Sequence, residues 1–536
     1  MIVTSAAKAW FPVVPTVSAR ALIATGALLH LVLAFSMGLS PDEAHYALYG
    51  AHVDWSYFDH PPMVGWLQAP FVAAGGADAL MRVVPMACWI VSAILAARLC
   101  RELPLAPSES PPEPSRQAAW AVGLLVLGPL FNLLGVALVP DTLLMPLVLA
   151  AMLTTWKLRD PARARHWRAW TGLALLLGLA VLSKYTGVFI VMGALLSLAS
   201  FHGKRLWRHR GFWLVTVIVT ASAAPVVYWN FQHDWASIAY QTRHASGDQD
   251  WKVVNVVRAL ALQLLAYGFL VPVGLTVALR RTPSKAGSGQ ARDASAARNM
   301  AFVFGAPVLL TFALLAGRGS SLPHWTACGW TALLPLTVAG CMRLKRRWAW
   351  SLVALQGLLL GAVVVTLFEG GFSGEYGSAA HSPPGLRPPG STPNPVADLY
   401  GWESAALHGA GLAEQHRASA LVVMNWSLAS RLAWYARPMP VIVVPDRADQ
   451  FALWFGHLEV GESALVVDWS RMPLPIPMGR DGFESCRLLD QIDTLQGGRQ
   501  IAHFSYVLCL NWHAGAATPT GASSARFQSV WTPYQP

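Results

Sequence analysis

The stretch TGLALLLGLAVLSKYTGVFIVMGALLSLASF (171–201) is almost continuously apolar, with Lys184 near its middle. A single helix of this length would extend about 46 Å, well beyond a hydrocarbon core of about 30 Å. The segments on either side, KLRDPARARHWR (157–168) and GKRLWRHR (203–210), are both basic. Because basic segments favour the cytoplasmic side of a membrane, both should lie on one side. The run should therefore cross the membrane twice and turn near Lys184.

The composition of the whole chain is typical of a membrane protein. Of its 536 residues, 54% are hydrophobic and only 12% are charged, whereas soluble globular proteins carry about 25% charged residues. A water-soluble multi-domain protein is therefore excluded. The sequence predicts a multi-pass α-helical membrane protein with about 11 or more transmembrane helices. The apolar runs lie at about 20–38, 83–100, 117–138, 142–156, 171–183, 187–203, 211–229, 257–279, 300–317, 326–342 and 349–368.

The distribution of charge gives the orientation. The formal net charge is +11, which in a soluble protein would suggest nucleic-acid binding. If the segments alternate from a cytoplasmic N-terminus, the inner segments hold 23 Lys and Arg, the outer ones up to residue 369 hold six, and the tail holds ten. The corresponding numbers of acidic residues are 5, 9 and 14. The positive charge thus lies on the inner side, and we expect no nucleic-acid partner.

Two parts of the chain precede the tail in this interpretation. Residues 1–369 form the membrane part. Lys8 and Arg20 stand before its first apolar run, but no convincing small-residue cleavage site follows that run. We therefore expect a retained first helix and no cleaved signal peptide. Residues 370–395 are rich in Pro, Gly and Ser, as in a linker without regular structure.

The pattern changes in the tail, residues 396–536. Short β-like runs alternate with helix-like stretches, which predicts a small α/β domain on the outer, periplasmic side. The β-like runs lie at 420–425, 439–444, 464–469 and 505–510, and the helix-like ones at 427–436 and 486–495. Cys486 and Cys509 lie in this part, and an oxidising compartment would allow them to form a disulfide. Two free buried thiols are the alternative.

Unusual polar residues gather on the outer side. The first outer loop (39–82) contains SPDEAHYALYGAHVDWSYFDHPPMVGWL (40–67). Carboxylates near a membrane boundary cost free energy unless they are solvated, paired or liganded. Simpler interpretations remain open: Asp141 could be a helix N-cap, Asp54 a solvated loop residue, and His45 and His52 surface or packing residues. The candidate site residues are Asp42, Glu43, Asp59 and His60 in the loop, and Asp141, Lys184, Tyr185, His233, Asp234, Arg243 and His324 beyond it.

These residue types suit group transfer from a phosphate donor. Such a reaction needs a carboxylate base to take a proton from the attacking hydroxyl. It also needs cations or a metal to stabilise the leaving phosphate. Asp42, Asp59 and His60 have suitable chemistry for a divalent metal cation, but their spacing is not diagnostic. No cofactor is certain, and a metal is one possibility that the sequence leaves open.

The order of these motifs resembles a known family. A first helix followed by PDEAHY (41–46) and YFDHPPMVGWL (57–67) is similar to the polyprenyl-phosphate-sugar-dependent glycosyltransferases of the membrane GT-C fold. The likeness is to bacterial relatives of protein O-mannosyltransferases and aminoarabinose transferases, glycosyltransferase families 39 and 83. It covers about residues 20–345, where VPDTLLMPL (139–147) and LPHWTACGWTALLPL (322–336) support it.

The resemblance implies a multi-pass protein of the bacterial inner membrane, surrounded by membrane lipids. Its expected activity is transfer of a sugar from a polyprenyl (undecaprenyl) phosphate to lipid A or another envelope glycan at the outer face, with inversion by a single displacement. The first acidic position of the family falls on Asp42, with Glu43 beside it, and the second falls on Asp59.

The resemblance also implies roles for the remaining candidates. Asp42 would act as general base or orient the acceptor, supported by Glu43 and Asp59. Relatives of the aminoarabinose type have EKPP where this chain has DHPP. His60 thus replaces a lysine, so a phosphate-binding role is not carried over to position 60. The expected donor-phosphate ligands are Lys184, Tyr185, Arg243 and His324, and the supporting residues are His60, Asp141, His233 and Asp234.

Three other functions fit parts of the sequence. A protein O-glycosyltransferase would use the same donor chemistry with a protein acceptor. A transporter or lipid flippase would normally place ionisable groups near the midplane, often in repeated halves, and no clear internal repeat is found. A non-catalytic scaffold would leave the outer cluster of acids and cations unexplained.

Overall fold

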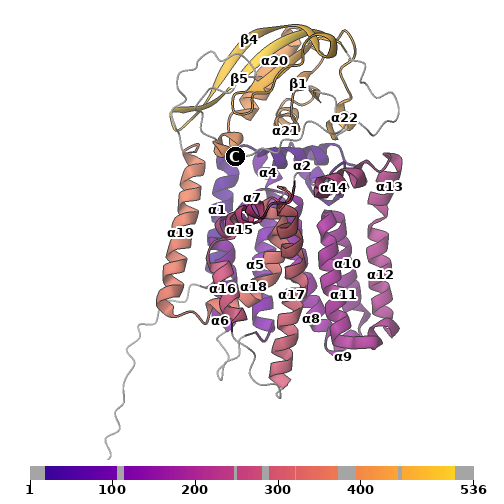
Figure 1. Ribbon diagram of the computed structural model, residues 1–536, viewed down its shortest axis with the longest axis vertical. Helices are drawn as coiled ribbons and strands as arrows, with labels where there is room; N and C mark the ends of the chain where they lie inside the picture. Colours follow the sequence, from indigo (N-terminus) through magenta and orange to yellow (C-terminus); the bar gives the residue numbers. More distant parts are fainter. Residues whose placement is uncertain are drawn as a thin grey trace, which may run out of the picture.

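The computed structural model describes residues 18–105, 114–246, 250–280, 289–319, 321–371, 394–444 and 450–513. These residues form a bundle of helices with a small sheet-containing domain at one end (Figure 1). The prediction of an α-helical membrane protein with a C-terminal α/β domain is confirmed.

Nineteen α-helices of the described residues belong to the bundle part. They are α1 (Ala19–Ser36), α2 (Pro41–Ala51), α3 (Met63–Ala73), α4 (Asp78–Met81), α5 (Val83–Glu102), α6 (Pro114–Leu127), α7 (Pro129–Val136), α8 (Pro140–Leu158), α9 (Pro161–Ala164), α10 (Trp167–Ser183), α11 (Val188–His202), α12 (Arg210–Ser222), α13 (Ala224–Gln232), α14 (Ala236–Ser246), α15 (Val253–Tyr267), α16 (Leu270–Leu279), α17 (Gly289–Ala316), α18 (Ala327–Cys341) and α19 (Arg346–Phe368). Short 3-10 helices are η1 (Tyr185–Gly187), η2 (Gly203–Arg208) and η3 (Pro323–Thr326).

The number of membrane spans differs from the expectation of about eleven. Among the described residues, seven helices are long and apolar enough to cross a membrane, or up to nine if each of two bent pairs counts as one span. The remaining two apolar runs form α10 and α18, of 17 and 15 residues. Both are shorter than the roughly 20 residues that a bilayer requires. The count of eleven is therefore not confirmed.

Two of the expected spans are bent, and a glycine lies at each break. The angle between α6 and α7 is 76°, and that between α15 and α16 is 105°. Gly268, between the second pair, has φ +81°, a conformation that favours glycine. Gln356 of α19 stabilises this break: its side chain accepts a hydrogen bond from Leu270 N (3.1 Å) and donates one to Tyr267 O (3.3 Å). As a result α15 lies across the bundle (Figure 1).

The run 171–201 divides into two helices, as its basic flanks predict. Helix α10 ends at Ser183, and Lys184 is extended, with φ −159° and ψ 147°. The chain then forms η1 and enters α11 at Val188. This turn directs the buried Lys184 side chain to the same end of the bundle as α2.

The C-terminal domain contains a five-stranded sheet in the order β2-β1-β3-β5-β4. Strands β1, β2 and β3 are parallel, and β5 runs antiparallel to β3 and β4. The elements are η4 (Pro395–Leu399), α20 (Trp402–Gln415), β1 (Leu421–Val423), α21 (Trp426–Tyr435), β2 (Val441–Val443), α22 (Gln450–Phe455), β3 (Ala464–Trp469), η5 (Gly479–Asp481), β4 (Phe483–Gln496) and β5 (Arg499–Trp512).

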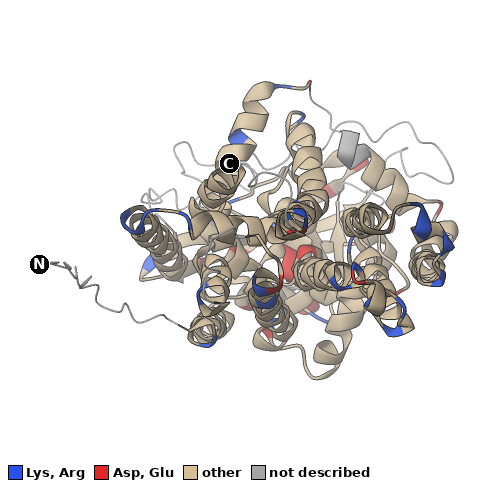
Figure 2. Cartoon of the chain, turned by 90° about the horizontal axis from the view of Figure 1, so that it is seen from below, with Lys and Arg blue, Asp and Glu red and all other residues tan. Residues whose placement is uncertain are grey.

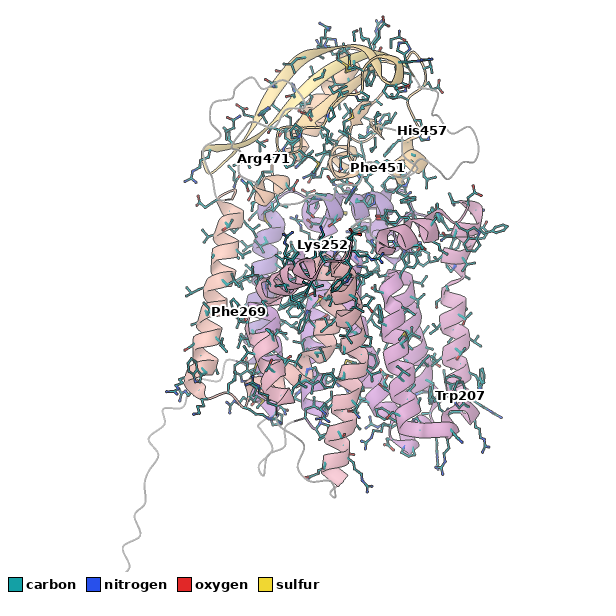
Figure 3. All side chains as sticks on the ribbon, in the orientation of Figure 1. Trp207, Lys252, Phe269, Phe451, His457 and Arg471 are labelled. Atoms are coloured by element: carbon teal, nitrogen blue, oxygen red, sulfur yellow. A yellow bond between two sulfur atoms is a disulfide. The ribbon has the colours of Figure 1, made fainter. Side chains whose placement is uncertain are left out.

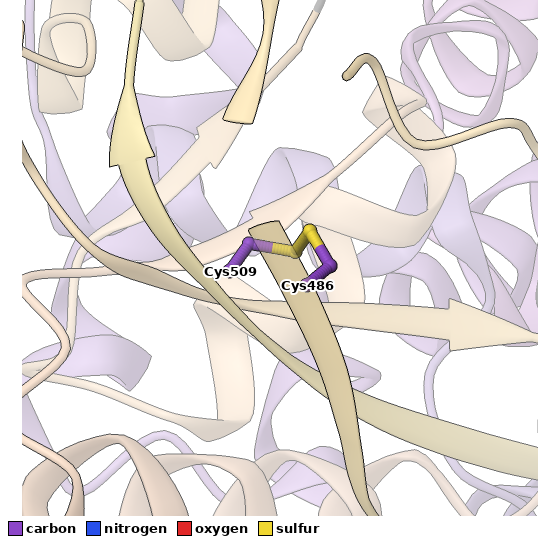
Figure 4. The surroundings of a disulfide bond; sticks show 2 residues. All are labelled: Cys486 and Cys509. Atoms are coloured by element: carbon purple, nitrogen blue, oxygen red, sulfur yellow. A yellow bond between two sulfur atoms is a disulfide. The ribbon is translucent and has the colours of Figure 1, made fainter. Parts of the chain in front are cut away.

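One local expectation in this domain is wrong. The stretch 486–495 belongs to strand β4, although the spacing of Leu488, Leu489, Ile492 and Leu495 resembles that of a helix. Long-range pairing with β5 outweighs the local pattern. Cys486 and Cys509 are register partners in this pair and form a disulfide (Figure 4). The alternative of two free thiols is thereby excluded in the structure.

The C-terminal domain packs directly on the first loop of the bundle. One buried apolar cluster joins Leu39, Ala44 and Leu48 of the loop and α2 with Leu432 and Trp434 of α21. The Tyr435 hydroxyl donates a hydrogen bond to Asp78 Oδ2 (2.6 Å) and accepts one from Leu39 N (3.0 Å). The acidic loop is therefore enclosed between the helices and the domain.

Candidate active site

Helix α2 positions the first acidic motif. Ser40 is its N-cap, and Pro41 occupies the first helical position, where the missing N–H costs nothing. Ser40 and Glu43 form a capping box: Glu43 N donates to Ser40 Oγ (3.4 Å), and Ser40 N donates to Glu43 Oε2 (3.0 Å). This start fixes Asp42 and Glu43 in the first turn, with Glu43 buried and Asp42 partly buried.

Glu43 lies in a closed ion pair. Arg82 Nε donates to Glu43 Oε1 at 2.8 Å, and both side chains are buried. The same guanidinium donates to the backbone oxygens of Met37 (2.7 Å) and Gly38 (2.8 Å) beyond α1. Because both carboxylate oxygens of Glu43 accept hydrogen bonds, this pair fixes α2 to the end of α1.

Asp59 is held by two side chains of α2. Its carboxylate accepts a hydrogen bond from the Tyr49 hydroxyl, and His45 Nε2 lies 3.7 Å from Asp59 Oδ2. Burial would raise the pKa of Asp59, but His60, His45 and Tyr49 together outweigh it and hold that pKa below its usual range. Asp59 is therefore ionised at neutral pH. Burial lowers the pKa of the neighbouring His60 to about 4, so this imidazole is neutral.

A second group of polar side chains consists of Asp141 of α8, Lys184 of the 183–187 turn and His324 of η3. Lys184 Nζ donates to Asp141 Oδ2 at 2.6 Å, and His324 Nε2 lies 3.9 Å from the same oxygen. Lys184 and Asp141 are 7% and 1% exposed. The other oxygen of Asp141, Oδ1, is buried with no hydrogen-bond partner among the described residues. Since α8 begins at Pro140 after Val139, Asp141 is not its N-cap, and that simpler interpretation is not supported.

Asp42 lies between these two groups. Burial raises its pKa, and the charges of His324 and His45, which lower it, only partly compensate. Asp59 and Glu43 add to the increase. The carboxyl of Asp42 thus interacts with both histidines and both neighbouring acids, and it holds a proton more readily than an exposed aspartate.

The remaining candidates are distributed around this centre. Tyr185 hydrogen-bonds Ser237 of α14 through their hydroxyls. His233 stacks on Trp229, with ring centroids 4.0 Å apart, and its Nδ1 lies 2.8 Å from Trp229 O. Asp234 is exposed. Arg243 belongs to α14, but its side chain is outside the described part of the structure.

Helix α14 also contacts the loop directly. Gln241 Nε2 donates to the backbone oxygen of Asp59 at 2.6 Å, and the rings of Phe58 and Tyr240 lie 4.8 Å apart. Asp54, expected to be solvated, accepts a hydrogen bond from Trp229 Nε1 (2.8 Å). Segments that are far apart in sequence therefore converge on one end of the bundle.

Comparison with known proteins supports the family resemblance. The sequence model of the family described as dolichyl-phosphate-mannose-protein mannosyltransferase matches residues 59–229. The lipid A galacturonosyltransferase RgtD of Rhizobium johnstonii is 22% identical over 315 residues, 57% of this chain and 61% of RgtD. The chain thus spans about three fifths of the length of this curated relative.

Two crystal structures of ArnT from Cupriavidus metallidurans share the architecture. One is in the apo state and the other is bound to undecaprenyl phosphate; each aligns at 15% identity with a TM-score of 0.56, over 91% of this chain and 97% of ArnT. The chain has a GT-C glycosyltransferase fold. The resemblance predicted from PDEAHY and YFDHPPMVGWL is therefore confirmed.

The described part of this GT-C protein contains no group of three or more His, Cys, Asp or Glu side chains arranged to hold a metal ion. Asp59 and His60 are adjacent in the loop, but Asp59 is engaged by Tyr49 and His45. The set Asp42, Asp59 and His60 does not form a ligand cluster.

Sequence reasoning missed His45 and the partners that the C-terminal domain supplies. His45 is buried, and Ser430 Oγ lies 3.3 Å from its Nδ1. The rings of Trp426, Phe451 and Trp454 lie within 5.5–5.7 Å of its ring; Figure 3 shows Phe451 on the side of the domain that faces the bundle. A signal for His45 existed, because Asp42, His45, Tyr46 and Tyr49 follow helical spacing on one face of α2. Ser430 is separated from His45 by 385 positions, and no local pattern connects them.

Proposed function

We propose that this GT-C protein is a bacterial inner-membrane glycosyltransferase. It transfers a sugar from a polyprenyl phosphate of the undecaprenyl type to lipid A or another envelope glycan. The site and the C-terminal domain face the periplasm, and the basic helix ends face the cytoplasm. The observation that carries the proposal is the convergence of Asp42, Asp59 and the Asp141–Lys184–His324 group beneath that domain.

The comparisons support the choice of donor and acceptor. RgtD is described as a lipid A galacturonosyltransferase, and ArnT has been crystallised with undecaprenyl phosphate. The disulfide in the C-terminal domain fits an oxidising compartment. A transporter is disfavoured, because the buried ionisable residues of this site lie at one end of the bundle, next to the loop that the domain covers.

In the proposed reaction, the acceptor hydroxyl attacks the anomeric carbon of the donor. Its proton passes to Asp42, and the bond between the anomeric carbon and the phosphate oxygen breaks. A single displacement of this kind inverts the anomeric configuration. The raised pKa of Asp42 suits a general base, because proton transfer is most effective when this pKa approaches the working pH.

Lys184 and His324 stabilise the departing phosphate. Lys184 is bound to Asp141, so the phosphate would share or replace Asp141 as the partner of this cation. Asp141 orients Lys184, Tyr185 lies beside it, and Arg243 of α14 is retained as a further ligand. Glu43 and Asp59 support the loop that carries Asp42. His60 interacts electrostatically with Asp59, Lys184 and Asp141. This mechanism gives no role to His233 and Asp234.

The test is an assay with purified protein, a panel of undecaprenyl-phosphate sugars, and lipid A, glycan and protein acceptors. Wild type should release undecaprenyl phosphate and glycosylate one acceptor class, and Asp42→Asn should lower kcat by about 10²- to 10⁴-fold, the usual contribution of a general base. Asp250→Asn, at an exposed position, is the matched control and should retain activity. No turnover with any donor, or full activity of Asp42→Asn, would refute the proposal.

A further inference from the structure

A cavity of about 380 Å³ lies at the end of α8, beside α9 and the start of α10. Figure 1 places α9 at the end of the bundle opposite the C-terminal domain, and Figure 2 looks onto that end and shows Lys and Arg around the helix ends. Its size lies within the range of pockets that hold small molecules. The site described above does not include any residue of its wall.

One side of this cavity carries cations. Lys157, Arg163 and Arg168 line it together with His166, and no Asp or Glu is among the described residues of the wall. Lys157 Nζ is 3.8 Å from Glu102, and Arg163 Nε is 3.8 Å from Asp160. Both distances exceed that of a direct hydrogen bond. The three cations therefore leave capacity for an anion.

A neighbouring cavity shares Lys157 and Arg163 but differs in charge. Its wall also contains Arg98 and Arg159, together with the acids Glu102 and Asp160. Arg98 is bound to Glu102 at 2.8 Å, and Arg159 is paired with Asp293. The second cavity has two acids beside its four cations, whereas the described wall of the first has none. The first cavity is therefore the more favourable one for an anion.

The other side of the first cavity is apolar and continues along the bundle. Ala169 and Gly172 of α10 and Thr154 of α8 form it. A Cβ atom added at Gly172 would meet no atom within 4 Å, so space is open there. Farther along α10, Leu175 and Leu179 are 54% and 40% exposed, as expected of a surface in contact with acyl chains. Trp167, 68% exposed, and Trp207 at the same end (Figure 3) suit the membrane interface.

We propose that this cavity binds the phosphate head group of an anionic glycerophospholipid of the inner leaflet. The phosphate contacts Lys157, Arg163 and Arg168, and one acyl chain follows Ala169 and Gly172 between α8 and α10. Basic pockets between helices on the cytoplasmic side of membrane proteins bind anionic head groups in this way. The site requires no sugar donor and is independent of the glycosyltransferase reaction.

The test measures lipid binding to the full chain, purified in detergent and freed of lipid, by native mass spectrometry. Phosphatidylglycerol should bind, and phosphatidylethanolamine should bind at least 10-fold more weakly. Arg163→Gln combined with Arg168→Gln should weaken phosphatidylglycerol binding by about 30-fold, as expected for two cations near the membrane surface. The control Arg205→Gln with Arg208→Gln, at exposed cations of η2 outside the cavity, should leave it within 2-fold, where about 2-fold corresponds to a few tenths of a kcal/mol.

A second variant separates a lipid from free phosphate. Gly172→Leu places a side chain on the open apolar side, where its Cβ atom would meet no atom within 4 Å, so the protein should remain folded and monodisperse. It should weaken phosphatidylglycerol binding by about 10-fold or more, because it blocks a buried acyl chain. Inorganic phosphate that binds as tightly as phosphatidylglycerol would overturn the lipid assignment. Equal binding of both lipids, or equal losses in the double variant and its control, would overturn the site.

Discussion

Two buried ion pairs lie at the same end of this bundle, and they differ in how completely they are satisfied. Arg82 and Glu43 use both carboxylate oxygens and several backbone oxygens, so nothing in that pair is left for a ligand. Lys184 and Asp141 leave one carboxylate oxygen without a partner among the described residues, with His324 at 3.9 Å from the other. A closed pair fixes structure, whereas an open pair can exchange partners with a substrate.

Breaking the closed pair should have the largest effect on stability. Glu43→Ala leaves Arg82 buried without its counter-ion, which typically costs 3–5 kcal/mol. We expect a clear fall in the thermal unfolding temperature of the detergent-solubilised protein. Glu403→Ala, at an exposed position of α20, should change it little. An unfolding temperature of Glu43→Ala equal to that of wild type would mean that the pair is not structural.

His324, beside the open pair, should make the stability of the protein depend on pH, whereas the Arg82–Glu43 pair should not. Burial lowers the pKa of His324 below its ordinary value of 6.5. The neutral imidazole is therefore favoured in the folded state, and its contribution to stability is complete above about pH 6.5 and lost as the pH falls through the lower folded pKa.

Thermal unfolding measured between pH 7.5 and 5 should show this dependence. Wild type and Glu43→Ala should lose stability on acidification with a similar slope, and His324→Gln should show a flatter curve. If His324→Gln leaves the slope unchanged, His324 is not buried in its neutral form as described.

The contact between the loop and the C-terminal domain should give the smallest effect. Tyr435→Phe removes the hydrogen bonds with Asp78 and Leu39, with an expected loss of about 2–3 kcal/mol of stability. Limited proteolysis should cut the variant faster than wild type, and Ser404→Ala, on the exposed part of α20, should behave as wild type. A larger loss of stability would place this contact among the main supports of the fold.

Much of the fold was predictable because membrane proteins expose their organisation in apolar runs and basic flanks. The turn at Lys184 follows from the length of 171–201 and the charge on both sides. The span count was not predictable, because the breaks at Gly128 and Gly268 depend on tertiary packing, such as Gln356 against Gly268. Strand β4 was mistaken for a helix because its pairing with β5 is non-local.

The candidate site was predictable residue by residue but not as a geometry. Asp42, Asp59, Asp141, Lys184 and His324 all stand out as polar residues at outer helix ends. The pairing of these residues does not stand out, because Lys184 pairs with Asp141 across 43 positions. The sequence also does not show that Arg82 binds Glu43, which gives Glu43 a structural role and leaves Asp42 as the reactive acid. The contact between Ser430 and His45 forms only when the C-terminal domain packs on the bundle, so no local sequence pattern predicts it.

The most direct test of the open pair is the binding of undecaprenyl phosphate to the purified protein. Lys184→Gln should weaken binding by about 10- to 100-fold, the usual value of a hydrogen bond to a charged group. Lys252→Gln, at an exposed position at the start of α15, should bind as wild type. Undiminished binding by a folded Lys184→Gln variant would contradict the claim that the Lys184–Asp141 pair is open to the donor phosphate.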